Sequence, residues 1–395
     1  MDGPLMRTRG RFTETEWSMV HFSTKHSRWT VSLALGFAML AGVPTAGQGP
    51  PLYEDKMKML VYLDAGGRER AISNATDWEK RRAHILANME QVMGPLPDRS
   101  GLNAPDMEVL TAEDLGDVIR KKVSFLSEPG DRVPAYLLVP KGLTGKAPAM
   151  LCLHQTTEIG KGEPAGVGGI PDLHYGLELA RRGYVTLAPD YVNFGEYEFD
   201  PYQNGYASAT MKGIWNHMRA VDLLQSLPEV DAGRIGCIGH SLGGHNSMYL
   251  SAFDRRLKVV VSSCGFNSFF KYYGGDLTGW SHPGYMPRIS ERYGKDPKRM
   301  PFDFTEVVAA LAPRGFFINA PLRDGNFEVS GVRDCVRAAA PVYALFGAPE
   351  RLLALHPDAE HAFPPEIRER AYAFVDEILK GVNPRQDDGS LRRQD

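Results

Sequence analysis

The chain has 395 residues, 43% of them hydrophobic and 24% charged, with a formal net charge of −3 at pH 7. The length suits one large α/β domain or two ordinary domains, and the composition is that of a globular protein. Because positive charge is not in excess, we expect no nucleic-acid partner.

Residues 1–47 are predicted to be a signal peptide, with its working part near residues 19–47. Basic residues precede the apolar run 29–43, and small residues follow it. This order is typical of a cleaved export signal, and Met19 is a better start than Met1 because the residues before it are polar. We expect a periplasmic or secreted protein without stable membrane insertion after cleavage. The alternative is a single membrane anchor, for which the apolar run is short.

Residues 48–105 are predicted to form an N-terminal helical extension, in which one amphipathic helix covers 74–94. Two strands with a turn between them follow, and from residue 147 onward strands and helices alternate. The expected strands are 117–127, 133–140, 147–154, 184–190, 234–240, 257–264, 315–321 and 351–358, and the expected helices are 173–183, 209–227, 243–253, 303–313, 331–347 and 366–381. This order predicts an α/β fold, with a mostly parallel central sheet and helices on both faces. The sheet domain is expected over 106–382, and a polar tail over 383–395.

The segment Gly239-His240-Ser241-Leu242-Gly243 reads G-x-S-x-G and lies between a predicted strand and a predicted helix. In a nucleophile elbow, a serine occupies a sharp turn from strand to helix, and small residues flank it because the turn packs closely against its neighbours. The turn also places the serine at a helix N-terminus, where free N–H groups stabilise a developing oxyanion. Ser241 is therefore the candidate nucleophile.

Other kinds of site are not supported. Gly239 and Gly244 have the spacing of a P-loop, but His245 stands where a lysine is required. A dinucleotide site is not expected either, because no G-x-G-x-x-G follows this strand. The four cysteines are far apart in sequence and show no zinc-ligand spacing, so we interpret them as buried thiols. We expect no disulfide framework, no metal and no organic cofactor.

A nucleophilic serine needs a base, and the base needs an acid that orients it. In this kind of fold the acid and then the histidine follow the serine, each in a loop after a later strand. Asp324 and His361 meet these requirements. The carboxyl ends of parallel strands meet at one edge of a sheet, so Ser241, Asp324 and His361 are predicted to converge there.

Four other residues near these positions are weaker candidates. Asp358 shares a loop with the histidine, and His356 falls inside a predicted apolar strand, where packing is its expected role. His240 and His245 flank the serine, and a side chain at either position would point away from the attacking oxygen. We interpret both as structural.

With these motifs the chain resembles the α/β-hydrolase superfamily, and is similar to its dienelactone-hydrolase-like and acetyl xylan esterase-like branches. The resemblance covers roughly residues 117–380 and is carried by "GHSLGG", "LRDGNF", "EHAFP", and "LCLHQTT" with "ARRGYVTLAPDYVNFGEY" after it. It implies that residues 106–382 are an α/β-hydrolase catalytic domain and that the protein is a serine hydrolase. The Gly-Cys-Ser motif of glucuronoyl esterases is absent, because His240 precedes the serine.

The resemblance also implies an oxyanion hole of two N–H groups. One belongs to the residue after the nucleophile, which is Leu242. The other comes from the loop after strand 147–154, where family members often carry His-Gly and then the donor residue. This chain has His154-Gln155-Thr156, so Thr156 is the expected donor and Gln155 the alternative.

The connection from Gly265 to Pro301 is unusually long, and long loops of this kind are usually functional. It is rich in aromatic residues without helical or strand periodicity. Trp280 and Tyr285 are candidates to line the substrate pocket, because Trp and Tyr offer stacking faces and a polar group. The alternative is that these rings only pack the loop against the sheet edge.

We expect an exported serine esterase that cleaves an acylated carbohydrate or another small ester through an acyl-enzyme. One alternative is a peptidase of the prolyl oligopeptidase kind, although roughly 60 residues before the sheet domain are too few for the propeller of those enzymes. The other alternative is a catalytically inactive hydrolase fold that serves as a binding module. The identity of the ester and the oligomeric state are not determined by the sequence.

Overall fold

The computed structural model describes residues 49–382. Its strands are β1 (Val61–Leu63), β2 (Glu69–Ala71), β3 (Met107–Asp114), β4 (Val118–Glu128), β5 (Asp131–Pro140), β6 (Ala147–Leu153), β7 (Val185–Pro189), β8 (Val230–His240), β9 (Leu257–Ser263), β10 (Gly315–Asn319) and β11 (Leu352–Leu355). Its α-helices are α1 (Ala75–Met93), α2 (Tyr175–Arg181), α3 (Ala209–Ser226), α4 (Leu242–Phe253), α5 (Arg288–Glu291), α6 (Phe304–Ala310), α7 (Val329–Leu345) and α8 (Pro365–Lys380). Short 3₁₀ helices are η2 (Gly160–Gly162), η3 (Pro171–Leu173), η4 (Tyr272–Gly275), η5 (Gly279–Ser281) and η6 (Pro349–Arg351).

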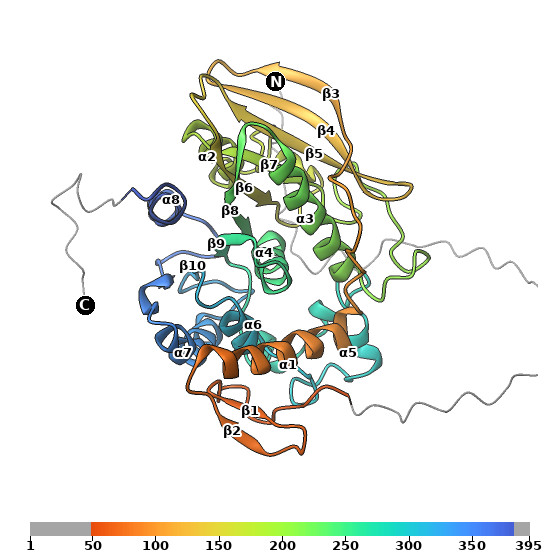
Figure 1. Ribbon diagram of the computed structural model, residues 1–395, viewed down its shortest axis with the longest axis vertical. Helices are drawn as coiled ribbons and strands as arrows, with labels where there is room; N and C mark the ends of the chain where they lie inside the picture. Colours follow the sequence, from red (N-terminus) through yellow and green to blue (C-terminus); the bar gives the residue numbers. More distant parts are fainter. Residues whose placement is uncertain (1–48, 383–395) are drawn as a thin grey trace, which may run out of the picture. The chain divides into compact units, whose positions relative to one another are not determined.

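Within the described residues, β3 to β11 form one sheet of nine strands in the order β11-β10-β9-β8-β6-β7-β5-β4-β3 (Figure 1). The strands β3, β4 and β5 pair antiparallel, and β5 also pairs antiparallel with β7. From β7 to β11 all neighbours are parallel. The predicted α/β fold with a mostly parallel sheet is therefore confirmed.

Side chains of the parallel strands enter two cores, because successive residues of a strand point to opposite faces of the sheet. On one face, Met150, Ile238 and Phe317 pack in a cluster with residues of α2 and α8. On the other face, Leu151 and Cys237 pack in a larger cluster with residues of α1, α3 and α4. Because helices cover both faces, the strands carry apolar residues at nearly every position.

Several elements were not predicted from the sequence. The edge strand β3 exposes most of its residues and lacks an apolar alternation, so its sequence gives little strand signal. The hairpin of β1 and β2 is short and largely exposed. The long connection from residue 265 to residue 301 also contains η4, η5 and α5, which are too short to show periodicity.

The N-terminal segment from residue 49 packs on the same core as the sheet. Trp78, Ile85 and Met89 of α1 are fully buried in the larger cluster. Arg81 donates a hydrogen bond from Nη2 to Glu306 Oε1 of α6 at 2.7 Å, and both side chains are completely buried. Figure 1 shows α1 running beside α6, with the hairpin of β1 and β2 next to it. The boundary at residue 105 stays a prediction.

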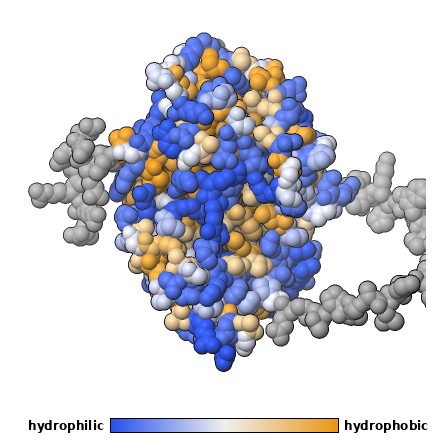
Figure 2. All heavy atoms as spheres, viewed as in Figure 1, coloured by the Kyte–Doolittle hydropathy of each residue, from blue (hydrophilic) through white to orange (hydrophobic). Residues whose placement is uncertain are grey.

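The predicted signal peptide and the predicted polar tail lie outside the described residues. Among residues 49–382, no helix is both long and apolar enough to cross a bilayer. The face drawn in Figure 2 is a mixture of polar and apolar residues. All four cysteines are buried and free, as predicted.

Candidate active site

Ser241 lies between the last residue of β8 and the first residue of α4. Its backbone has φ 51° and ψ −115°, a conformation that residues other than glycine rarely adopt. The N–H of Ser241 donates to the carbonyl of Ser263 at 2.8 Å, which holds the turn against the end of β9. Such local strain at a strand-to-helix turn is typical of a nucleophile elbow.

The glycines around Ser241 are required by packing. A Cβ at Gly239 would overlap the backbone of Gly243, and a Cβ at Gly243 would overlap the carbonyl group of Leu153 in β6. A Cβ at Gly244 would lie only 2.8 Å from the Cα of Gly265. The sharp turn is thus possible only because three backbones approach each other without side chains between them.

Asp324 and His361 come together in the loops after β10 and β11. His361 Nδ1 lies 3.0 Å from both Oδ1 and Oδ2 of Asp324. Asp324 Oδ1 also accepts hydrogen bonds from the N–H groups of Asn326 and Phe327, at 2.9 and 3.0 Å. The carboxylate therefore orients the imidazole and leaves Nε2 as the nitrogen available to a substrate or nucleophile.

The electrostatics of Asp324 favour its ionised form. Burial alone opposes ionisation, but the hydrogen bond and the charge of His361, with the N–H groups of Phe327 and Asn326, keep the pKa of Asp324 below its usual value. An ionised acid beside Nδ1 stabilises the positive imidazolium that forms when Nε2 takes a proton.

Backbone hydrogen bonds join the two loops that carry this pair. Beyond the strands, Leu322 N donates to Pro357 O at 2.9 Å and Arg323 N donates to Ala359 O at 3.0 Å. The buried side chain of Asn319 donates to Ala362 O at 2.8 Å, directly after the histidine. These contacts position His361 relative to the sheet edge.

His240, the residue before Ser241, makes contact with this pair. The rings of His240 and His361 meet edge to face, with centroids 4.9 Å apart. Among the described residues, His361 Nε2 is buried and has no hydrogen-bond partner, so the bond to Ser241 is not formed in this conformation. In free enzymes such catalytic hydrogen bonds often tighten only when substrate binds.

One predicted oxyanion donor follows Ser241 directly, and the other belongs to the loop after β6. Leu242 is the first residue of α4, so its N–H has no acceptor within the helix. Thr156 is exposed and Gln155 half-buried in the loop after β6, which runs beside β8. The side chain of Gln155 donates to Glu163 Oε1 at 3.2 Å, and His154 Nε2 accepts from Tyr191 N at 2.9 Å, which fixes the start of the loop.

The rival residues have other partners. Asp358 is exposed and forms an ion pair with Arg323. His356 Nδ1 lies 2.9 Å from Ala320 O. His240 is buried beside Ser263 Oγ at 2.9 Å, and burial, with the nearby His361, places its pKa well below the usual range. It is therefore neutral at physiological pH.

Comparison with known proteins gives the family. Residues 174–380, more than half of the chain, match the prolyl oligopeptidase family. The chain belongs to this family. It is a serine hydrolase with the α/β-hydrolase fold, and the resemblance seen in its motifs is confirmed.

Relatives of this prolyl oligopeptidase family member include several hydrolases. The chain is 26% identical over 312 residues to "Putative hydrolase YtaP" of Bacillus subtilis (strain 168), covering 75% of this chain and all of that protein. It is 25% identical over 207 residues to the 4-O-methyl-glucuronoyl methylesterase of Hypocrea jecorina (strain QM6a), covering 46% of this chain and 44% of that protein. Among solved structures, a glucuronoyl esterase from Solibacter usitatus superimposes with a TM-score of 0.65 at 21% identity, covering 84% of this chain and 98% of that one.

In this member of the prolyl oligopeptidase family, Trp280 is buried. Only 3% of it is exposed, and its ring packs against those of His245, Phe304 and Phe327. This position favours the packing alternative for Trp280. Tyr285 is half-buried, with its ring 5.8 Å from that of His245. A role of either residue in substrate binding stays a prediction.

Cys264 was not predicted to belong to the site. It follows β9 with φ 48°, and its thiol donates to Ala362 O at 3.3 Å. Donor atoms of Cys264, Asp324 and His361 lie within 4.8 Å of one another. A zinc ion takes such donors, but here the carboxylate and the imidazole already pair with each other. The positive φ of Cys264 could not be predicted, because no pattern in the sequence indicates it.

Proposed function

We propose that this serine hydrolase cleaves carboxylic esters of carbohydrates through an acyl-enzyme, with Ser241, His361 and Asp324 as its catalytic residues. The observation that carries the proposal is the Asp324–His361 pair beside the strained turn of Ser241. A serine, a histidine and an acid in these roles form the apparatus of nucleophilic acyl transfer.

In the first half of the reaction, Ser241 Oγ attacks the ester carbonyl while His361 Nε2 takes its proton. The negative oxygen of the tetrahedral intermediate accepts hydrogen bonds from Leu242 N–H and from the N–H of Thr156, or of Gln155 in its place. The imidazolium then protonates the leaving alkoxide, and the alcohol departs. In the second half, water attacks the acyl-enzyme by the same route and releases the acid.

The choice of a carbohydrate ester rests on the relatives. One relative named above is a 4-O-methyl-glucuronoyl methylesterase and the structural neighbour is a glucuronoyl esterase, and the sequence motifs resemble those of acetyl xylan esterases. Two arrangements are then compatible with the chemistry: an acyl group carried by a sugar hydroxyl, or a uronic acid esterified to an alcohol. Both present the same carbonyl to Ser241.

A fluorophosphonate probe tests the nucleophile directly. We expect the probe to label the wild type and to spare the Ser241→Ala variant. Ser247→Ala is the control, because Ser247 is fully buried in α4 and its hydroxyl donates to Gly243 O at 2.8 Å. Labelling of Ser241→Ala would refute the assignment, and a wild type that reacts with no probe would favour an inactive binding module.

A substrate panel tests the bond that is cleaved. It comprises p-nitrophenyl acetate, acetylated xylotriose, methyl glucuronate and a proline-containing peptide amide. We expect hydrolysis of p-nitrophenyl acetate and of at least one of the two sugar esters. Turnover of the peptide amide alone would contradict the proposal and establish a peptidase.

We also propose that the protein is exported. The support is the order of basic, apolar and small residues before residue 48. N-terminal sequencing of the mature protein should find a start near Gly47 or Gln48, in material recovered outside the cytoplasm. An intact apolar segment 29–43 in the membrane fraction would indicate an anchor instead.

A further inference from the structure

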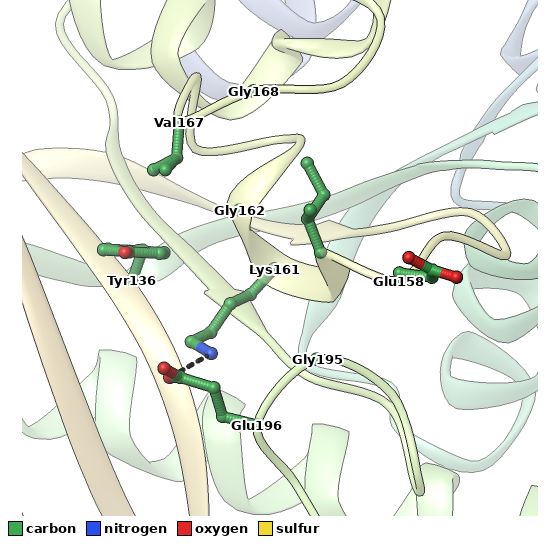
Figure 3. A pocket seen from close by; sticks show the side chains of 9 residues that line it. Tyr136, Glu158, Lys161, Gly162, Val167, Gly168, Gly195 and Glu196 are labelled. Atoms are coloured by element: carbon green, nitrogen blue, oxygen red, sulfur yellow. Dashed lines mark hydrogen bonds and ion pairs between the residues drawn. The ribbon is translucent and has the colours of Figure 1, made fainter.

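A pocket of about 260 Å³ lies beside the loop that begins with the proposed oxyanion donors (Figure 3). The residues that line it include Tyr136, Ile159, Lys161, Val167, Gly168 and Glu196. Most of these residues belong to the loop between β6 and α2, and the others to β5 and to the loop after β7. The volume is slightly below the range for drug-sized ligands, which suits one small ring.

The lining combines apolar faces with charged groups. Tyr136 offers a half-buried ring, and Ile159 and Val167 expose 41% and 51% of their surface. Glu196 Oε2 forms an ion pair with the ammonium group of Lys161 at a distance of 2.8 Å. Figure 3 draws this ion pair as a dashed line. A sugar ring has the same mixture, because its C–H faces are apolar and its hydroxyl groups donate to carboxylates.

One lining residue, Lys161, belongs to a buried ion pair. Lys161 Nζ lies 2.6 Å from Asp190 Oδ2, and both side chains are nearly inaccessible to solvent. Asp190 also accepts from Lys161 N at 2.8 Å and from Glu196 N at 3.0 Å. Gly160 and Gly195 have positive φ, and a Cβ at either would overlap this carboxylate. The ion pair therefore fixes the loops after β6 and β7 to each other.

The same loop connects the pocket with the nucleophile. Leu153, the last residue of β6, pairs with Gly239 of β8, and the elbow packs on its carbonyl group. The segment from His154 to Thr156 leads from that contact to Glu158, at the wall of the pocket. A group bound in the pocket would thus lie on the side of Ser241 where the oxyanion donors are expected.

We infer that this pocket is a subsite for a pyranose ring of the carbohydrate ester, stacked on Tyr136 and hydrogen-bonded by Glu196. The inference rests on the proposed function, because the ring belongs to the substrate whose ester group reaches Ser241. Rigid walls held by Lys161 and Asp190 suit such a subsite, since a preformed pocket loses little entropy on binding.

The experiment uses a substitution that fills the pocket with a larger side chain. Gly168 lines it without a left-handed backbone, and a Cβ there would lie 3.7 Å from Ile159 Cδ1, so Gly168→Leu is tolerable. We expect KM for the sugar ester that the wild type hydrolyses, acetylated xylotriose or methyl glucuronate, to rise about 10-fold or more, because one lost subsite contact changes discrimination by this amount. Hydrolysis of p-nitrophenyl acetate should stay within about twofold of the wild type. Gly145→Leu is the matched control, because nothing lies within 4 Å of a Cβ at Gly145.

The outcomes separate the subsite from the proposed function. Equal loss on both esters, or no loss on either, would overturn the subsite while leaving the esterase intact. Hydrolysis of neither sugar ester by the wild type would also overturn it. A wild type inactive on every ester would refute the proposed function itself. If Gly168→Leu is unstable, Val167→Trp is the second variant, because residue 167 is exposed and lines the same pocket. It must also raise KM for the sugar ester and leave the hydrolysis of p-nitrophenyl acetate nearly unchanged.

Discussion

At the scale of single residues, the hydrogen bond between Asp324 and His361 determines which nitrogen of the imidazole carries the proton. An imidazole exists in two neutral tautomers, and only the one with its proton on Nδ1 leaves Nε2 able to take the proton of a serine. The two carboxylate oxygens of Asp324, each 3.0 Å from Nδ1, select that tautomer. In the proposed mechanism, the buried and unpaired Nε2 of His361 is the atom that takes this proton.

We expect Asp324→Asn to lower kcat by about 10³- to 10⁴-fold with little change in KM, because an amide can donate to Nδ1 and stabilise the wrong tautomer. Steady-state kinetics on p-nitrophenyl acetate measure this. Asp358→Asn is the control, since Asp358 is exposed and paired with Arg323, and it should keep the wild-type kcat. If Asp324→Asn kept the wild-type kcat and Asp358→Asn lost it, Asp358 would be the acid of the site.

At the scale of elements, the turn from β8 to α4 shows how close backbone packing holds a strained residue. A positive φ at Ser241 is unfavourable by itself, and it persists because β6, β9 and the loop after β9 enclose the turn. Small residues at positions 239, 243 and 244 leave room for these neighbours. The strain of one residue is thus balanced by the packing of three elements.

Gly243→Ala should therefore lower the free energy of unfolding by about 3 kcal/mol or more, because the added methyl group overlaps the carbonyl of Leu153 and forces backbone shifts. Urea unfolding, followed by tryptophan fluorescence, measures the change. The matched substitution Gly145→Ala meets nothing within 4 Å and should change stability by less than about 0.5 kcal/mol. Equal stabilities of the two variants would show that the elbow tolerates a side chain.

The connection between β9 and α6 is held by an aromatic cluster around Trp280. We expect Trp280→Ala to lower the free energy of unfolding by about 3–5 kcal/mol, because it removes a large buried side chain. Both p-nitrophenyl acetate and the sugar ester should then lose activity together as the loop loosens. Phe270→Ala, at a position 43% exposed, is the control for a ring on the same segment. An unchanged melting temperature with a higher KM for the sugar ester alone would instead support a substrate contact.

At the scale of the whole described chain, the N-terminal segment is part of the hydrolase core. The buried pair of Arg81 and Glu306 joins α1 to α6, and Asp303 caps α6 while accepting from Ser268 Oγ at 2.7 Å and Phe269 N at 2.8 Å. Helix α1 is thus connected through α6 to the long stretch after β9. The sheet edge that carries the candidate site is supported by residues far away in the sequence.

Arg81→Met should destabilise the protein by about 3–5 kcal/mol, since it leaves a buried carboxylate without its partner. Burial raises the pKa of Glu306 from 4.5 to about 7 in the folded state, against the opposing charge of Arg81. A raised carboxyl pKa favours folding most at low pH, and this contribution disappears as the pH rises through 7. We therefore expect the loss in the variant to be larger at about pH 8 than at about pH 5.5.

Urea unfolding at both pH values tests this expectation. Lys80→Met is the control, because the ammonium group of Lys80 pairs with Asp77 at the protein surface and its removal should give the same small change in stability at both pH values. Arg81→Met/Glu306→Leu should recover much of the stability and abolish the pH dependence. A single variant with the same loss at both pH values would contradict the protonation of Glu306.

Local signals in the sequence determined the order of strands and helices, the α/β fold and the residues that stand at the carboxyl ends of the strands. Buried parallel strands read as apolar runs, and Ser241, Asp324 and His361 each follow such a run. The prediction required only that these ends share one edge of the sheet, which is a property of parallel strands. For the same reason the sequence favoured His361 over His356, which falls inside a predicted strand.

Only the tertiary structure decided which distant residues meet. Cys264, Asn319 and His240 surround the histidine loop, yet none carries a local signal, because their contacts depend on the register of neighbouring strands. The burial of Trp280 and the ion pair of Lys161 with Asp190 likewise come from loops that fold over the sheet edge. Periodicity describes a residue's own element, whereas burial and pairing depend on what the rest of the chain places against it.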